Sequence, residues 1–167
     1  MNHKILSIAL CTLLFSSLSL ADGHKKSEHK HGHDKHAKNP GLVLVKSNHN
    51  VKMTADKLEA VLTEKGMTVF ARIDHGAAAQ NVGVDLRPTE LVIFGNPKVG
   101  SPLMACAQSV AIDLPQKMLI WEDEKGATWL GYNDPEYLEA RHSIEGCEPV
   151  IQKIAGALKA FSAAAAK

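Results

Sequence analysis

The sequence predicts an α+β domain in which a largely antiparallel sheet is covered by helices on one face. The expected elements follow the order strand, helix, several strands with an inserted helix, and terminal helices, and this order favours such a sheet. Two aromatic runs on either side of a turn predict a β-hairpin. The last apolar pattern has the spacing of a helix with one buried face.

The amino terminus has the features of a cleavable secretory signal peptide. Lys4 supplies a positive charge, an apolar run from Ile5 to Phe15 follows, and Ser19 and Ala21 place small side chains where a signal peptidase reads. The apolar run is shorter than the roughly 20 residues of a membrane-spanning helix, which favours a cleaved signal over an uncleaved anchor. We therefore expect residues 1–21 to be removed and the mature protein to be periplasmic or secreted by a bacterium.

The remainder of the chain has the size and composition of one soluble domain. Of the 19 Lys and Arg residues only Lys4 lies in the expected signal, so the other basic residues balance the 18 Asp and Glu residues. This balance suggests no nucleic-acid partner. No later apolar stretch reaches membrane-spanning length, so we expect no membrane partner after signal cleavage.

Residues 22–41 are expected to form a disordered, His-rich tail. Between Asp22 and Lys38 there is no aliphatic side chain larger than alanine. Such a segment cannot bury enough apolar surface to offset the entropy of ordering it. A single folded domain is therefore expected over residues 42–167.

The first half of that domain predicts two strands and two helices. Residues 42–46 are an apolar run suited to a strand, and Thr54 is expected to cap a helix that ends at Gly66. Residues 67–73 alternate with a period of two, which predicts a strand with one face formed by every second residue. Residues 74–84 are rich in alanine and are expected to be helical.

A buried strand and a further helix are expected next. Residues 91–94 are apolar throughout, as in a buried strand. A helix should begin near Ser101, because Pro102 would then lie in its first turn, where a missing N–H is tolerated.

The last third predicts the hairpin and two helices. Residues 118–122 and 128–132 are strand-like and lie on either side of Asp123-Glu124-Lys125-Gly126, which is turn chemistry. Asp134-Pro135 is expected to cap a short helix, and Pro149 to open the final one.

Several short blocks of the chain resemble a known family, the bacterial proteins grouped as domain of unknown function 302. The blocks are Ile73-Asp74-His75, the run from Leu86 to Leu91, Phe94-Gly95-Asn96-Pro97, the run from Gly100 to Met104, Asp113-Leu114-Pro115 and Tyr132-Asn133-Asp134-Pro135. The resemblance covers the chain from about Leu42 to its end. It implies a TATA-binding-protein-like fold, a curved antiparallel sheet with helices on one face, and it implies no activity.

Cys106 and Cys147 remain after signal cleavage, in a compartment where thiols tend to be oxidised. A disulfide is the favoured interpretation. A shared metal site is the alternative, and a redox-active pair is disfavoured because the two cysteines do not form a C-x-x-C motif.

The tail carries the pattern of a transition-metal site. Cleavage after Ala21 would start the mature chain with Asp22-Gly23-His24, whose α-amine, two amide nitrogens and imidazole can form a planar set of four nitrogens. Cu(II) and Ni(II) favour that geometry. Four further imidazoles, suited to Zn or Cu, belong to His29, His31, His33 and His36. The alternative is a solvated tail that binds no metal, and no organic cofactor is predicted.

Three residues of the domain are candidate ligand contacts. His75 follows a predicted strand end, while Lys98 and Ser101 belong to the segment Gly95–Ser101 between a strand and a helix. That segment superficially resembles a phosphate loop. It has Ser101 where the motif needs lysine, and Pro97 together with Pro102, which follows the segment, removes N–H donors, so nucleotide binding is disfavoured. A structural role for His75 and a simple turn at the loop are the alternatives.

Three functions follow from these features. The leading hypothesis is a periplasmic protein that binds Cu, Ni or Zn through its tail. The second is a small-ligand-binding or protein-interaction module that uses a cleft near His75 and the Gly95–Ser101 loop. An enzyme comes last, because the sequence contains neither G-x-S-x-G nor H-E-x-x-H.

Overall fold

The domain is a five-stranded antiparallel sheet covered by helices. The computed structural model describes residues 40–167. The expected signal peptide and nearly all of the expected tail lie outside the described residues. The sheet has the order β1-β5-β4-β3-β2, and every neighbouring pair is antiparallel. This confirms the predicted fold class.

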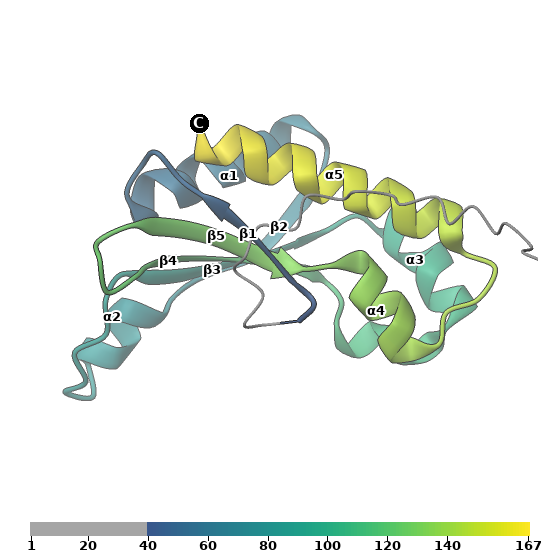
Figure 1. The fold of residues 1–167 in the computed structure, drawn as a ribbon, viewed down its shortest axis with the longest axis horizontal. Coiled ribbons are helices and arrows are strands. Elements are labelled where there is room, and N and C mark those ends of the chain that lie inside the picture. Colours follow the sequence, from purple (N-terminus) through teal and green to yellow (C-terminus); the bar gives the residue numbers. More distant parts are fainter. Residues whose placement is uncertain (1–39) are drawn as a thin grey trace, which may run out of the picture. The chain divides into compact units, whose positions relative to one another are not determined.

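The elements alternate along the chain in the predicted order. The strands are β1 (Leu42–Lys46), β2 (Thr68–Asp74), β3 (Thr89–Gly95), β4 (Gln116–Glu122) and β5 (Thr128–Asn133). The helices are α1 (Val51–Glu64), α2 (His75–Gln80), α3 (Pro97–Cys106), the 3-10 helix η1 (Gln108–Ile112), α4 (Pro135–His142) and α5 (Glu148–Ala166). In Figure 1, α1 and α5 lie over one face of the sheet, α2 lies at one end, and α3 and α4 lie at the other. No helix within residues 40–167 is long and apolar enough to cross a membrane.

The core lies between the sheet and the pair α1 and α5. The alternate residues Met118 and Ile120 of β4 and Leu130 of β5 face these helices and are fully buried. Phe94 of β3 meets Phe161 of α5 edge to face, with ring centroids 6.3 Å apart. Burial of each such side chain contributes about 1.5–3 kcal/mol, so this layer provides most of the driving force for the fold.

Two helices begin earlier than the sequence predicted. Asn50 caps α1 by accepting a hydrogen bond from the Met53 N–H at 2.9 Å, and Thr54 lies inside the helix, where its hydroxyl donates to the Asn50 carbonyl. Asn96 caps α3 in the same way, so Pro97 takes the first helical position and Pro102 lies in the helix interior. Asparagine is as good a cap as threonine, and here the earlier residue is used.

Two further predictions were wrong in extent. Residues 74–84 are not one helix, because α2 ends at Gln80 and turns follow. The single face predicted for residues 67–73 is interrupted at Phe70, where the register of β2 shifts. Val69 is consequently opposite the buried Phe94, whereas Ala71 is opposite Ile93 on the other face. A bulge adds one residue and so reverses the alternation beyond it.

The short 3-10 helix η1, which follows α3, was not predicted from the sequence.

Arg72 of β2 is the centre of a charge network between the sheet and α1. It donates hydrogen bonds to Asp56 (2.6 Å), to Glu59 (3.0 Å) and to Glu90 of β3, which is only 8% exposed. The hydrogen bond to Glu90 is the main cause that raises the pKa of Arg72, and hydrogen bonds from Lys52 and Arg72 lower the pKa of Asp56. Because the pKa of Asp56 is lowered in the folded protein, these hydrogen bonds stabilise the fold at pH values above the ordinary carboxyl pKa. This stabilisation is lost as the pH falls through the pKa of Asp56 in the folded state.

We expect Arg72→Ala to lower the free energy of unfolding by about 3 kcal/mol, because it leaves Glu90 buried without its charge partner. The double variant Arg72→Met/Glu90→Leu should recover most of that loss, since no buried charge then remains. Urea denaturation of both variants measures the effect. If the free energy of unfolding of Arg72→Ala lies within about 0.5 kcal/mol of the wild-type value, the role given to Arg72 is contradicted.

Candidate functional site

An apolar pocket of about 300 Å³ lies beside α3, at the end of the sheet where β3 ends and β4 begins. Its lining comes from the end of β3, the start of β4, α3, η1, α5 and the beginning of β2. The apolar lining residues are Met67, Phe70, Phe94, Pro97, Val99, Met104, Ala111, Leu114, Pro115, Ile154, Ala157, Leu158 and Phe161. Lining of this kind is typical of a site for a small molecule.

Local sequence features shape the mouth of this pocket. Asn96 ends β3 and starts α3, and its side chain both accepts from the Lys98 N–H (2.9 Å) and donates to the Gly66 carbonyl (3.1 Å). A Cβ on Gly95 would lie 3.2 Å from the ring of Phe70, so glycine leaves room for that ring beside β3. The bulge in β2 and the glycine in β3 therefore work together to place Phe70 in the lining.

The polar side chains of the lining differ in burial. Lys153 and Ser101 are exposed, and Asn96 is half-buried with both ends of its amide bonded. Gln116 is 9% exposed, and its Nε2 finds no hydrogen-bond acceptor among the described residues. A buried amide in this condition costs about 1–3 kcal/mol. Among the polar side chains of the lining, Gln116 thus stands out as a buried amide whose nitrogen has no hydrogen-bond acceptor among the described residues.

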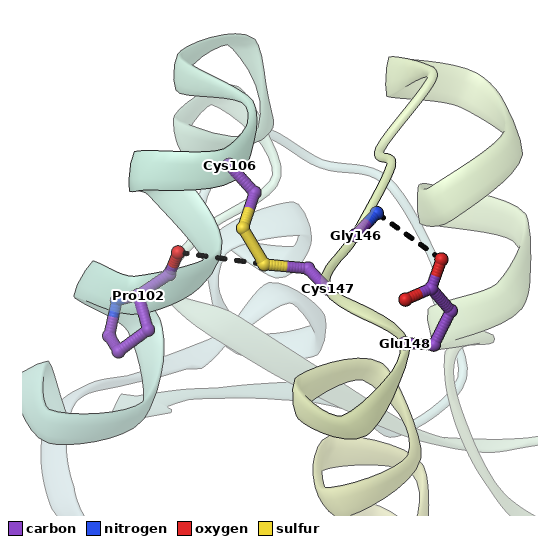
Figure 2. The surroundings of a disulfide bond; sticks show 5 residues. All are labelled: Pro102, Cys106, Gly146, Cys147 and Glu148. Carbon is purple, nitrogen blue, oxygen red and sulfur yellow. Dashed lines mark hydrogen bonds between the residues drawn. A yellow bond between two sulfur atoms is a disulfide. The ribbon is translucent and has the colours of Figure 1, made fainter.

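Two walls of the pocket are joined covalently. Figure 2 shows the disulfide between Cys106, at the end of α3, and Cys147, which directly precedes α5. The two Cα atoms are 6.5 Å apart, and the bridge closes a loop with a sequence separation of 41. Beside it, Glu148 Oε1 accepts from the Gly146 N–H at 3.2 Å. The structure therefore contains the disulfide that the sequence favoured.

A serine, a histidine and an aspartate form a chain of hydrogen bonds next to the pocket wall. His142 Nε2 is 2.6 Å from Asp113 Oδ2, and His142 Nδ1 is 3.1 Å from Ser109 Oγ. Arg141 adds a second bond to Asp113 at 3.2 Å. Ser109 is exposed and does not line the pocket. The array therefore ties η1 to α4.

A second hollow, of about 440 Å³, lies between β1 and α5 and includes Tyr132, Asp134 and Lys159 in its lining. Burial is the main cause that raises the pKa of Tyr132, and a hydrogen bond with Ser162 opposes this shift. The buried polar groups of this hollow thus pair with each other. Because the first pocket instead contains a buried amide nitrogen for which the described part of the chain supplies no acceptor, it is the stronger candidate site.

The structure separates the residues that the sequence grouped in one cleft. Ser101 lines the pocket, and Lys98 is exposed on α3 outside the lining. His75 starts α2 at the opposite end of β3, because Asp74 pairs with Glu90 whereas Thr68 pairs with Gly95. The segment Gly95–Ser101 is not a loop in the structure, because it contains the last residue of β3 and the start of α3, which Asn96 caps. It contributes to the pocket, but His75 does not share that pocket.

Sequence reasoning did not select Gln116. One signal could have found it, since Gln116, Met118 and Ile120 alternate along β4 and all three are buried on the side that faces the helices. A glutamine in such a series is a polar group in an apolar layer. The long-range partners in the pocket, from Met67 to Phe161, carry no comparable local signal.

The predicted metal ligands cannot be placed. Asp22, Gly23, His24, His29, His31, His33 and His36 all lie outside the described residues. Within residues 40–167, no group of three His, Cys, Asp or Glu side chains is arranged to hold a metal ion.

Comparison with known proteins finds matches of family, sequence and structure. The family model described as "Domain of unknown function DUF302" matches residues 43–161. A solved structure described as an uncharacterized conserved protein DUF302 from Bacillus stearothermophilus superposes with a TM-score of 0.62 and 21% identity. The match covers 77% of this chain and 97% of that one, and it supports the fold alone.

Curated relatives are longer proteins. The fluoride-specific ion channel FluC 1 of Brucella suis is 48% identical over 104 residues, which cover 62% of this chain and 41% of the relative. FluC 1 of Brucella abortus is also 48% identical over 104 residues and is covered to 38%. The matched part of this chain thus spans about two fifths of the length of these relatives.

Proposed function

This chain belongs to the family described as Domain of unknown function DUF302, and from that premise we propose that its folded domain binds a small, largely apolar molecule. The observation that carries the proposal is the pocket of about 300 Å³ between β4, α3 and α5. The family itself names no activity, so the argument rests on the chemistry of this pocket. The channel activity named for the Brucella relatives is theirs, and an apolar lining does not favour a small, strongly hydrated anion such as fluoride.

The apolar lining supports a ligand rather than a packing defect. Sites for small molecules are concave, are lined mainly by hydrophobic and aromatic side chains and contain a few polar groups, and the pocket has each of these features. This pocket has about ten times the volume that a water molecule takes up in the liquid. Its aromatic and methionine side chains would gain dispersion contacts from an apolar occupant.

A bulky residue in the pocket wall tests this proposal. Ala157 lies in the lining on α5, and Ala160 is exposed on the same helix outside the lining. We expect Ala157→Phe to weaken the binding of the neutral, apolar fluorescent probe N-phenyl-1-naphthylamine about tenfold or more, because the added ring fills the space that the probe needs. Ala160→Phe adds the same ring and should leave binding unchanged.

Fluorescence titration measures the affinity, and near-ultraviolet circular dichroism checks that each variant is folded. Equal probe affinity in folded Ala157→Phe and Ala160→Phe would show that the pocket is not the binding site.

We also propose a second function, the binding of Cu, Ni or Zn by the tail of the exported, periplasmic protein. The specific observation is the sequence Asp22-Gly23-His24 at the start of the expected mature chain, followed by four histidines before Lys38. The two functions use different parts of the chain, so each can hold without the other. A shortened chain that begins at Asn39 separates them, because it should lose the metal and keep the pocket.

A further inference from the structure

Gln116 brings a polar group into an otherwise apolar part of the pocket. It starts β4 directly opposite Phe94 of β3, and both side chains belong to the series that faces the helices. Phe94 is fully buried, and Leu114 and Pro115 precede Gln116 in the lining. The amide is therefore removed from water by its neighbours as well as by the helices.

The donor capacity of this amide is not used within residues 40–167. Its Nε2 is buried without an acceptor among those residues, in contrast to Asn96, whose amide is bonded at both ends. Native structures rarely leave such a group unsatisfied, and each instance calls for a physical reason. A leucine or methionine would fill the same place at lower cost, because it has no polar group to desolvate.

We infer that Gln116 determines ligand specificity, by donating a hydrogen bond from Nε2 to a neutral carbonyl oxygen on an otherwise apolar ligand. The inference rests on the proposed function of the pocket and names the class of ligand: an apolar ketone, aldehyde, ester or amide. The carbonyl end of the ligand lies at Gln116, and the rest of the molecule contacts the apolar lining.

A neutral acceptor fits this position better than an anion or water. Burying a carboxylate costs far more than burying a carbonyl, and the charged side chain of the lining, Lys153, is exposed and so interacts mainly with solvent. A buried water needs two to four polar partners, whereas Leu114 and Pro115, the lining residues that precede Gln116 in the chain, offer no polar side chain. The ligand is therefore the better source of the missing acceptor.

A pair of probes with the same shape tests the inference on the full chain. Acetophenone carries a carbonyl oxygen, and α-methylstyrene has a CH₂ group in its place. The variant Gln116→Met removes the donor and keeps the length of the side chain. Gln152→Met makes the same change at an exposed position of α5 outside the lining and serves as the control.

The measured quantity is the ratio of the two dissociation constants in each protein, since this ratio compared between proteins cancels the difference in probe hydration. In Gln116→Met, loss of one hydrogen bond should weaken the binding of acetophenone relative to α-methylstyrene about three- to tenfold. Gln152→Met should keep the wild-type ratio. Acetophenone, in contrast to α-methylstyrene, should also shift the side-chain amide signal of Gln116 in ¹H–¹⁵N spectra. This signal is identified by its absence from the spectrum of Gln116→Met.

Two negative outcomes have different meanings. In the first outcome, both probes bind, Ala157→Phe weakens the binding of both, and the ratio of dissociation constants is the same in wild type and Gln116→Met. The pocket is then a binding site, but the role of Gln116 is overturned. If neither probe binds and the affinity for N-phenyl-1-naphthylamine is unchanged in Ala157→Phe, the proposed function itself fails, and the inference fails with it.

Discussion

Removing the bridge between Cys106 and Cys147 is expected to lower the free energy of unfolding by about 4 kcal/mol. A cross-link over a sequence separation of 41 restricts the unfolded chain, and its loss lets that chain gain entropy. For a domain of this size the change corresponds to a fall in Tm of about 10 °C or more. Cys147 is buried, so alanine at both positions is preferable to a polar replacement.

Thermal and urea unfolding of Cys106→Ala/Cys147→Ala and of the oxidised wild type measure this effect. The wild type with a reducing agent is the matched control, because it breaks the same bond without changing the sequence. Oxidised and fully reduced proteins that unfold at the same midpoint would contradict the role of the bridge. Because the bridge links α3 to α5, probe affinity for the pocket should fall in the reduced protein as well.

The second large effect is expected at the amino terminus that signal cleavage after Ala21 would create. If the mature chain starts at Asp22, His24→Ala should abolish the visible absorption band of a planar Cu(II) site, because the imidazole is one of its four nitrogen ligands. Binding also displaces protons from two backbone amides, so copper uptake should weaken as the pH falls. Mass spectrometry of the exported protein checks the start at Asp22, and one extra residue before it should remove the band.

A second histidine variant provides the control for this experiment. His36→Ala also removes one imidazole from the tail, but it should keep the copper band and reduce only zinc binding. The sites formed by the later histidines should lose metal as the pH falls through about 6.5, where imidazole becomes protonated. Unchanged copper titrations in His24→Ala would refute the planar site. Equal metal content in the mature protein and in a chain that begins at Asn39 would refute the whole tail proposal.

The type and order of most elements could be predicted because the forces that set them are local. Two aromatic, strand-like runs, with Asp123 and Gly126 in the turn between them, were enough to predict the hairpin, which the structure confirms. Asp134 caps α4 through its side chain, as expected from the Asp-Pro pair. A cap, a turn or a period-two pattern depends on residues within a few positions of one another.

Features that depend on register were predicted less well. The bulge at Phe70 reverses the faces of β2, and nothing in the alternation of residues 67–73 indicates it. The position of His75 relative to the Gly95–Ser101 loop follows from the antiparallel pairing of β2 with β3, which places them at opposite ends of the strands. One residue of shift changes the face of every side chain beyond it, so these details are decided by packing across the sheet.

By itself, the sequence determined the α+β class, the family and the pairing expected for Cys106 and Cys147. Only the tertiary structure decided that Gln116 faces an apolar pocket with Phe161 and Phe70, residues far from it in the chain. The physical reason is the range of the interactions. Caps and alternation act between near neighbours, whereas a pocket exists only when strands and helices distant in sequence have packed and excluded water from the side chains between them.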